Sequence, residues 1–312
     1  MSEILPRDCG ELPAPTVEEV GDGVFAYVQL DGSWGLNNAG ILCGSRGVVL
    51  VDTSFTAPRA RRLAAAVAEL TPQAVRTVIN THHHGDHTYG NFVFPEATVI
   101  AHERCREAVL ATGLATTKMF PGVDWGEIEV VAPFVTFSDR LSVYVDDLKV
   151  ELVEMGPAAH TTNDIVAWIE SSGVLFSGDV VLHGATPFVL MGSVSGALHA
   201  LERLRALGPR LIVPGHGAVC GPDVIDDQVS YLRLVQETAT KAAAAGLSPL
   251  EAARQCELGR FAAWTDPERL VGNLHRALSE LNGDDPGAPL PYPAIFQEMI
   301  TFNGGEPLRC CA

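Results

Sequence analysis

The sequence predicts a layered α/β protein, and three observations lead to this fold class. Short apolar runs alternate with helical patterns along most of the chain, which is typical of sheets covered by helices. No internal repeat or low-complexity linker divides the chain. Four of the apolar runs end beside His or Asp residues, at the edge where open α/β sheets bind ligands. We therefore expect one domain over residues 1–312, with a core over about 20–220 and a helical part over about 221–312.

The N-terminal part is predicted to be rich in strands, because apolar and β-branched residues gather between Gly-containing turns. The strands expected here are Val24–Leu30, Asn38–Cys43, Val48–Asp52, Val75–Asn80 and Thr98–His102. In a first helix, Pro58 lies near the start, and Leu63, Val67 and Leu70 recur at helical spacing. A second helix is expected over Glu103–Thr112.

A long irregular segment follows over residues 113–133. It carries Met119, Phe120 and Trp125. Loops of this length are usually functional lids or disordered segments. Three large apolar residues favour a lid that packs against the rest of the protein.

Strands resume after this segment and then give way to helices. The expected strands are Leu141–Val145, Leu148–Glu154, Ile165–Glu170, Val174–Ser177 and Leu211–Val213. The expected helices are Ala197–Leu207, Pro222–Ala245, Pro249–Leu258, Pro267–Leu281 and Pro293–Phe302. Several of these helices open with proline, which suits the first helical turn.

The charge of the chain excludes some partners. The formal net charge is −17, so we expect neither a nucleic-acid partner nor docking on an anionic membrane. The best basic patch is Arg59, Arg61 and Arg62, for which a solvated helix face is favoured over a contact with an acidic carrier protein. We find no signal peptide and no apolar segment near the roughly 18 residues of a membrane span, and therefore expect a cytoplasmic, soluble protein.

The cysteines favour reduced thiols. There are seven, an odd number, and none forms a Cys-x-x-Cys pair. A disulfide framework or a thiolate zinc site is therefore not expected. We expect the adjacent Cys310 and Cys311 to be inert.

The histidines carry the evidence for a metal site. Four of the ten fall in the run Thr81-His82-His83-His84-Gly85-Asp86-His87. In an extended segment residues i and i+2 point the same way, so His82 and His84 can share one ion. Gly85 permits a tight turn that brings Asp86 and His87 to a second position. A solvated His-rich loop or a tag would not be expected to contain this order of ligands inside the chain.

Further candidate ligands follow other predicted strands. His160 comes after Leu148–Glu154, Asp179 directly follows Val174–Ser177 and its glycine, and His216 follows Leu211–Val213. The full set is five histidines and two aspartates: His82, His84, Asp86, His87, His160, Asp179 and His216. Seven ligands are too many for one tetrahedral ion but suit two ions that share a carboxylate. Imidazole and carboxylate without thiolate suit zinc, and also iron or manganese.

The order H-x-H-x-D-H, then His, then Gly-Asp, then Gly-His-Gly resembles the metallo-β-lactamase superfamily, over residues 24–217. The resemblance implies an αββα sandwich with a helical C-terminal extension and two zinc ions at one edge. It implies that His82, His84 and His160 bind the first ion, that Asp86, His87 and His216 bind the second, and that Asp179 bridges them. Asp86 is also the candidate catalytic residue, and Asp52 matches an acid behind the ligands that orients them.

A narrower resemblance covers nearly the whole chain. The motifs Val123–Ile128, Gly184–Phe188, Gly192–Val194 and Phe302–Gly305 are similar to those of the actinorhodin-type aromatic polyketide cyclase–thioesterases. This implies aldol ring closure, thioester hydrolysis or both, on a polyketide bound to an acyl carrier protein. A flat apolar substrate needs aromatic walls. The candidates are Trp34, Phe120, Trp125, Phe188 and Met191.

Three other functions stay open. A general metallohydrolase of lactones, lactams or glutathione thioesters would have a small polar pocket, and the absence of an obvious basic cluster in the C-terminal half counts against glutathione. An oxidative enzyme with a single iron would not need Asp86 and His87. A binding protein without catalysis would not need a complete ligand set.

Overall fold

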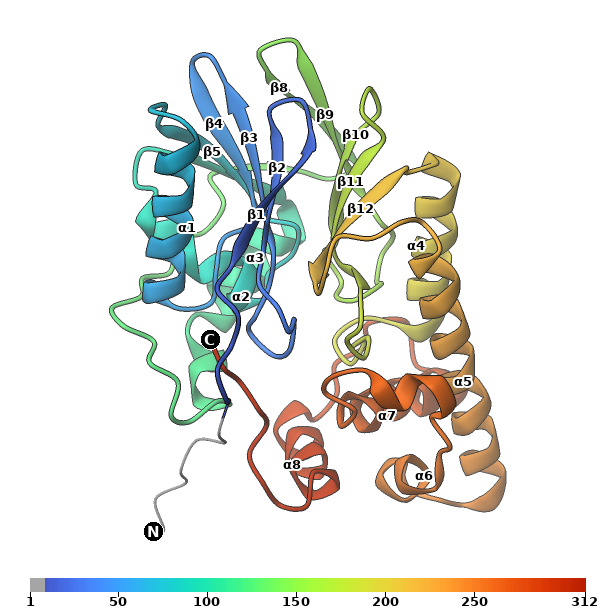
Figure 1. The fold of residues 1–312 in the computed structure, drawn as a ribbon. Helices are drawn as coiled ribbons and strands as arrows, with labels where there is room; N and C mark the ends of the chain where they lie inside the picture. The colour runs from blue at the N-terminus through green and yellow to red at the C-terminus, as the bar shows by residue number, and fades with distance from the viewer. Residues whose placement is uncertain (1–8) are drawn as a thin grey trace.

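Two β-sheets face each other between two layers of helices in the computed structural model, which describes residues 9–312 (Figure 1). The first sheet has seven strands in chain order: β1 (Thr16–Gly21), β2 (Val24–Val28), β3 (Ala39–Gly44), β4 (Gly47–Val51), β5 (Val75–Ile79), β6 (Thr98–His102) and β7 (Val135–Phe137). The second has five, in the order β12 (Leu211–His216), β11 (Val174–Leu182), β10 (Ile165–Ile169), β9 (Leu148–Glu154) and β8 (Arg140–Val145). The predicted αββα sandwich is confirmed.

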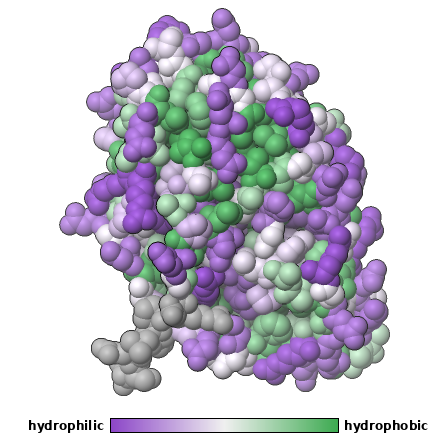
Figure 2. Space-filling model, viewed as in Figure 1, coloured by the Kyte–Doolittle hydropathy of each residue, from purple (hydrophilic) through white to green (hydrophobic). Residues whose placement is uncertain are grey.

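Apolar side chains from both sheets form a common core. This core includes Leu42 and Val49 of the first sheet and Leu152, Ile165 and Phe176 of the second, all buried. Strands that are covered on both faces are expected to be apolar throughout, as β10 is. In Figure 2 hydrophobic residues gather over the strands in the upper half of the visible face, and polar residues surround them.

Helices cover the outer face of each sheet. On the first sheet lie α1 (Ala57–Leu70) and α3 (Glu103–Thr112). The second sheet is covered by α4 (Val194–Leu207) and α5 (Val224–Ala245), and α6 (Pro249–Gln255), α7 (Arg269–Leu281) and α8 (Tyr292–Phe302) pack beyond them. The chain therefore ends in a helical part that is continuous with one layer of the sandwich.

Local sequence signals explain where these helices begin. The side chain of Thr56 caps the backbone N–H of Arg59 at the start of α1, and Pro58 occupies the first turn. Ser248 and Glu251 form a capping box at the start of α6. Both helices start close to the prolines that the sequence pointed to.

Two strands were not predicted, and two of the predicted strands, β11 and β12, continue well past their expected ends. β1 has only one buried residue, and β7 has three residues and none buried, so neither shows an apolar run. β12 runs to His216 instead of ending at Val213. β11 continues to Leu182 instead of ending at Ser177, with irregular pairing to β12 around Gly178. Asp179 therefore lies within the strand at an irregularity, and not just past its end as expected.

The prediction that all thiols are reduced is wrong for Cys9 and Cys311, which form a disulfide with their Cα atoms 5.7 Å apart. Cysteine counting failed because it gives no information on which residues meet in the fold. The pair joins the segment before β1 to the segment after α8, and Figure 1 shows these segments together below α1. Over the described residues, no helix combines the length and the apolar character of a membrane span.

Candidate metal centre

The first group of candidate ligands contains three histidines and one aspartate. The His82 and His84 side chains come from the loop after β5, and His160 comes from the loop after β9. Nδ1 of His84 lies 3.1 Å from Nε2 of His82 and 2.8 Å from Nε2 of His160. With Asp179, these residues offer ligand atoms that all lie within 4.8 Å of one another.

The second group contains Asp86, His87 and His216, again with ligand atoms within 4.8 Å of one another. Asp86 and His87 lie in the short helix α2 (Gly85–Thr88), and His216 is the last residue of β12. Oδ2 of Asp86 is 3.1 Å from Nε2 of His216 and 3.8 Å from Nε2 of His87. The sequence run that begins at His82 therefore supplies both groups.

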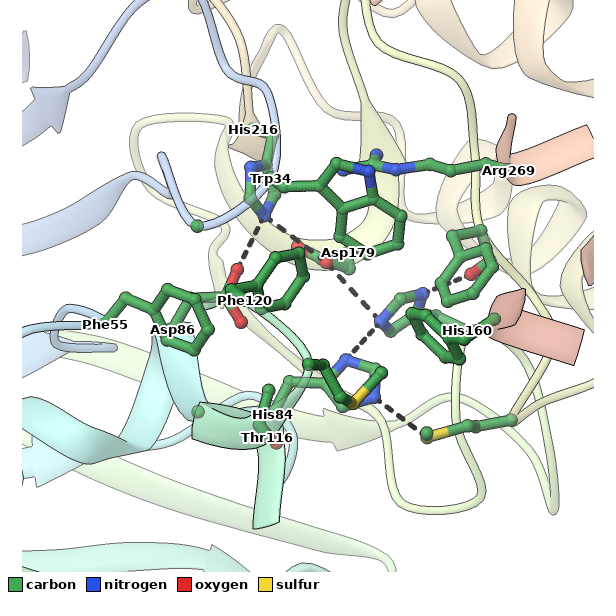
Figure 3. A pocket seen from close by; sticks show the side chains of 16 residues that line it. Trp34, Phe55, His84, Asp86, Thr116, Phe120, His160, Asp179, His216 and Arg269 are labelled. Carbon is green, nitrogen blue, oxygen red and sulfur yellow. Dashed lines mark hydrogen bonds and ion pairs between the residues drawn. The ribbon is translucent and has the colours of Figure 1, made fainter. Parts of the chain in front are cut away.

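Asp179 lies between the two groups (Figure 3). Its Oδ1 is 3.2 Å from Nε2 of His87. Its Oδ2 is 3.4 Å from Nε2 of His160 and 3.6 Å from Nε2 of His216. One carboxylate thus faces ligands of both groups, the position of a bridging ligand.

Asp52 fixes the orientation of two histidines from behind. It accepts hydrogen bonds from the backbone N–H and the hydroxyl of Thr81, both at 2.7 Å, and its Oδ2 lies 2.8 Å from Nδ1 of His87. Because the Thr81 hydroxyl donates to Asp52, it accepts from Nδ1 of His82 at 3.0 Å. The Nε2 atoms of His82 and His87 are then free of protons when the rings are neutral. This is the position in which the sequence resemblance put Asp52.

Backbone carbonyls orient two more rings. Nδ1 of His160 donates to the carbonyl oxygen of Phe188, and Nδ1 of His216 donates to that of Gly32 at 3.1 Å. The Nε2 atoms of both rings therefore also carry their lone pairs toward the cluster. A second hydrogen bond of this kind is usual for metal-binding histidines.

The fifth ring, that of His84, has a different partner. Its Nε2 lies 3.3 Å from the thioether sulfur of Met191, a weak acceptor, which leaves Nδ1 as the lone-pair nitrogen. All five histidines thus direct a lone pair into the space that they share with two carboxylates. Five imidazole lone pairs and two carboxylates face one another with no hydrogen-bond donor between them, and a bound cation would stabilise this arrangement.

Two buried atoms show the same need. When His87 is neutral, its buried Nε2 and the buried Oδ1 of Asp179 are both acceptors, 3.2 Å apart, and neither has a hydrogen-bond partner. A buried polar atom without a partner costs about 1–3 kcal/mol. A divalent metal would bind both atoms, and nitrogen and oxygen donors of this kind suit zinc. The residues present therefore fit a divalent metal site.

Charges in the cluster shift its pKa values in opposite directions. Burial, helped by neighbouring imidazoles, holds the pKa values of His82 and His84 well below the usual range. Burial also opposes protonation of His87, but the carboxylates of Asp179, Asp52 and Asp86 outweigh it and raise its pKa well above the usual range. Without a metal, a proton on His87 supplies part of the missing positive charge.

Glycines allow the backbone to approach the ligands. A Cβ on Gly215 would lie 1.9 Å from Oδ1 of Asp179, so no other residue fits there. Gly85 is also needed, but not for the reason expected from the sequence. Its backbone is helical, and the constraint comes from the ring of Tyr89, which would lie 2.5 Å from a Cβ.

A cavity with aromatic walls opens beside the cluster (Figure 3). It encloses about 580 Å³, part of it open to solvent. The ring centroid of Trp34 lies 5.1 Å from that of Phe188, 5.7 Å from that of Phe120 and 6.3 Å from that of Phe296. The candidate ligands that line it are His84, Asp86, His160, Asp179 and His216. The candidate ligands therefore form the floor of an apolar cavity.

Four of the five predicted wall residues line this cavity: Trp34, Phe120, Phe188 and Met191. The expectation for Trp125 is wrong, because its ring packs edge-on against Phe55, with centroids 4.7 Å apart, one layer behind the wall.

Phe120 is buried, so the segment over residues 113–133 packs onto the body of the protein at this point, as expected of a lid.

The sequence analysis missed several wall residues. Phe55 follows β4, Arg269 begins α7, and Phe296 lies in α8. Phe55 follows an expected strand end, which is a usable signal. Arg269 and Phe296 come from helices whose placement over the cavity no local pattern reveals.

Arg269 is the one Lys or Arg residue of the cavity lining. Its guanidinium carbon lies 4.0 Å from the centroid of the Trp34 ring, and its Nη2 lies 2.9 Å from Asp266. The Trp34 indole N–H donates to Glu268 at 2.8 Å. The start of α7 thus holds Trp34 in place beside the cluster.

Comparisons with known proteins agree with this geometry. Residues 32–216 match the model of the family described as "Metallo-beta-lactamase superfamily". The chain is 24% identical to a type 2 metallo-β-lactamase of Bacteroides fragilis, over 72% of this chain and 88% of that protein. It is 25% identical to a hydroxyacylglutathione hydrolase of Rhodospirillum rubrum, over 87% of this chain and 89% of that protein.

Solved structures show the same fold. A metallo-β-lactamase from Pontibacter korlensis has a TM-score of 0.59 at 19% identity, covering 70% of this chain and 99% of that chain. The DIM-1 metallo-β-lactamase has a TM-score of 0.56 at 18% identity, covering 72% and 99%.

Proposed function

Because the chain belongs to the metallo-β-lactamase superfamily, whose members similar to it are metal-dependent hydrolases, we propose that it is a two-zinc polyketide cyclase and thioesterase. Its substrate is an aromatic polyketide intermediate bound to an acyl carrier protein. The reaction is aldol ring closure, thioester hydrolysis or both. The observation that carries this proposal is the aromatic cavity directly above the candidate ligands.

The two groups of ligands divide between two zinc ions in this proposal. His82, His84 and His160 would hold the first ion, and Asp86, His87 and His216 would hold the second. Asp179, which contacts both groups, would serve both ions. Two zinc ions supply Lewis acidity toward a carbonyl oxygen and ionise water near neutral pH.

The side chains of the protein then have distinct tasks. Asp86 lines the cavity, and it is the candidate that accepts a proton from the attacking water or from the carbon acid of the substrate. Burial opposes its ionisation, but His87 and His216 outweigh burial and lower its pKa, so it is a carboxylate at neutral pH. Asp52 and Thr81 hold the histidines in their required tautomers.

The cavity walls favour a flat apolar substrate. Trp34, Phe120 and Phe188 pack against one another in tilted and edge-on arrangements, and all three line the cavity. Aromatic contacts contribute about 0.5–1.5 kcal/mol each beyond the burial of area. These walls exclude water from the reacting carbonyl and orient the conjugated part of the substrate.

A general metallohydrolase of lactones, lactams or thioesters is the second candidate. The similarity to the hydroxyacylglutathione hydrolase of Rhodospirillum rubrum favours a thioester. Glutathione itself is less suited to the cavity, because its two carboxylates would meet a single basic side chain, Arg269, which is already paired with Asp266. An oxidative single-iron enzyme and a binding protein without catalysis fit less well, since both groups of ligands are complete.

Mass spectrometry of the zinc-loaded enzyme with a carrier-bound poly-β-ketone tests the proposal. Aldol ring closure leaves the mass of the acyl group unchanged but alters its fragmentation, and the dehydration that can follow it appears as loss of one water; thioester cleavage appears as release of the carrier thiol. We expect at least one of the two, and none with His84→Ala. Hydrolysis of simple lactones or thioesters without any reaction of the polyketide would support the second candidate instead.

A further inference from the structure

A groove separate from the metal centre lies beside α1, between the segment before β1 and the segment after α8. It encloses about 830 Å³, part of it open to solvent. The residues that line it are Leu12, Pro13, Ala14, Pro15, Gln29, Arg59, Arg62, Cys311 and Ala312. Two arginines and no Asp or Glu side chain line this groove in a protein with a formal net charge of −17.

Arg59 is buried there without an acidic partner. The residue is only 6% exposed. One guanidinium nitrogen donates to Oε1 of Gln29 at 3.1 Å and the other to the carbonyl oxygen of Asn37 at 3.5 Å, whereas Nε has no partner. Among residues 9–312, the partners of this guanidinium are neutral oxygens, and it forms no ion pair with an Asp or Glu side chain.

The energetics favour an anion near Arg59. Burial lowers its pKa, and the nearby charge of Arg62 lowers it further. Tyr27, Cys310 and Asp86 oppose this lowering of the Arg59 pKa, and Asp86 belongs to the candidate metal ligands. A buried charge without a counter-ion is costly, so a bound anion would stabilise the arrangement.

Arg62 supplies a second cation to the same groove. It is exposed, one helical turn further along α1, and it has no acidic partner in the described residues either. Arg61, its neighbour, is equally exposed but does not line the groove. The basic patch considered from the sequence is therefore split, with Arg59 buried, Arg62 in the groove and Arg61 outside it.

We propose that this groove is a binding site for a phosphate group. The planar guanidinium of Arg59 and its unpaired N–H groups suit the oxygens of a phosphate, and Arg62 adds a second charge. The apolar wall of Leu12, Pro13 and Pro15 leaves room for a small organic group esterified to the phosphate. This site does not depend on the reaction proposed for the metal centre.

Occupation of the groove also links three parts of the chain. Its walls come from α1 and from the two terminal segments that the Cys9–Cys311 disulfide joins. A phosphate held by Arg59 and Arg62 would hold these segments against the helix. Binding should therefore stabilise the folded protein by mass action.

Calorimetric titration of the full-length, zinc-loaded protein with inorganic phosphate, at constant ionic strength, tests the site. We expect saturable binding and a rise in melting temperature in phosphate relative to chloride. Arg62→Gln should weaken binding about fivefold, because one charge-assisted contact is lost, while Arg61→Gln should leave it unchanged. Arg59→Gln should abolish phosphate binding. Arg59 is buried, so this variant could fail to fold; Arg62→Gln changes an exposed residue and tests the site in that case as well.

Phosphate is also a ligand for divalent metals, so the titration is repeated with His84→Ala. Binding that survives in His84→Ala and weakens in Arg62→Gln supports the groove. A parallel titration with n-butyl phosphate distinguishes the two sources of the phosphate group. If the natural ligand is a phosphate ester, n-butyl phosphate should bind more tightly than inorganic phosphate; if it is free phosphate, the two should bind with equal affinity. The proposal is overturned if phosphate does not bind saturably, if Arg62→Gln binds like the unaltered protein, or if Arg61→Gln loses as much affinity.

Discussion

The carboxylate of Asp52 lies 2.8 Å from Nδ1 of His87 and holds that ring with its other nitrogen toward Asp179. Asp52 has a positive φ of 63°, which few residues other than glycine, asparagine and aspartate adopt readily. The backbone at this position is therefore shaped to aim a carboxylate at a metal-binding ring.

We predict that Asp52→Asn weakens zinc binding at the second position by about 10–100-fold, since the carboxylate no longer orients His87. Asparagine tolerates the same backbone conformation, so the change isolates the charge. Competition titration with a chromogenic chelator measures the two affinities separately. Asp146→Asn, at another positive φ but in an exposed turn, is the control and should bind two zinc ions normally.

His84→Ala should abolish activity and reduce the zinc content while leaving the fold largely intact. His84 offers Nδ1 to the first group and lies at the floor of the cavity. Metal analysis by mass spectrometry and circular dichroism measure the two effects. His199→Ala, on the exposed face of α4, should change neither quantity. Full activity of His84→Ala would contradict the assignment of this site.

Zinc affinity should fall as the pH falls. In the metal-free protein the pKa of His87 is raised well above its usual range by nearby carboxylates, so the ring is protonated at neutral pH. Zinc needs the unprotonated Nε2, and binding must release this proton. Below that pKa, each unit of pH should weaken the second site about tenfold for the one proton released. Calorimetry in buffers of different ionisation enthalpy counts the protons. A pH-independent affinity would contradict this account.

Phe120→Leu should raise KM about tenfold with a smaller change in kcat, because Phe120 belongs to the cavity wall and an aromatic contact is lost. Trp125→Phe is the matched comparison. Its ring packs behind Phe55 and does not line the cavity, so its effect on KM should be much smaller. Steady-state kinetics of both variants, with their melting temperatures, decide the point. Equal effects of the two changes would place Trp125 nearer the substrate than the structure does.

Local patterns in the sequence predicted most of the fold. The strands β6 and β9 and the helix α3 have the predicted bounds, since each is a clear apolar or periodic run between turn residues. The convergence of the candidate ligands was also predictable, because residues at the ends of neighbouring strands meet at one edge of a sheet.

Other features depend on tertiary packing that no local pattern contains. The irregularity that places Asp179 within β11 arises from pairing with β12, and Phe296 reaches the cavity only because α8 folds back over it. The disulfide between Cys9 and Cys311 joins residues 302 positions apart. Periodicity describes one element at a time, so it could not place any of these three.

The bond between Cys9 and Cys311 closes nearly the entire polypeptide into a covalent ring. After a single proteolytic cut in any loop between them, the disulfide would still join the two fragments. The fragments would therefore migrate separately on a gel only under reducing conditions. For the same reason, a circular permutation that joins the present ends by a short peptide and opens the chain in an exposed turn should still allow both sheets to form.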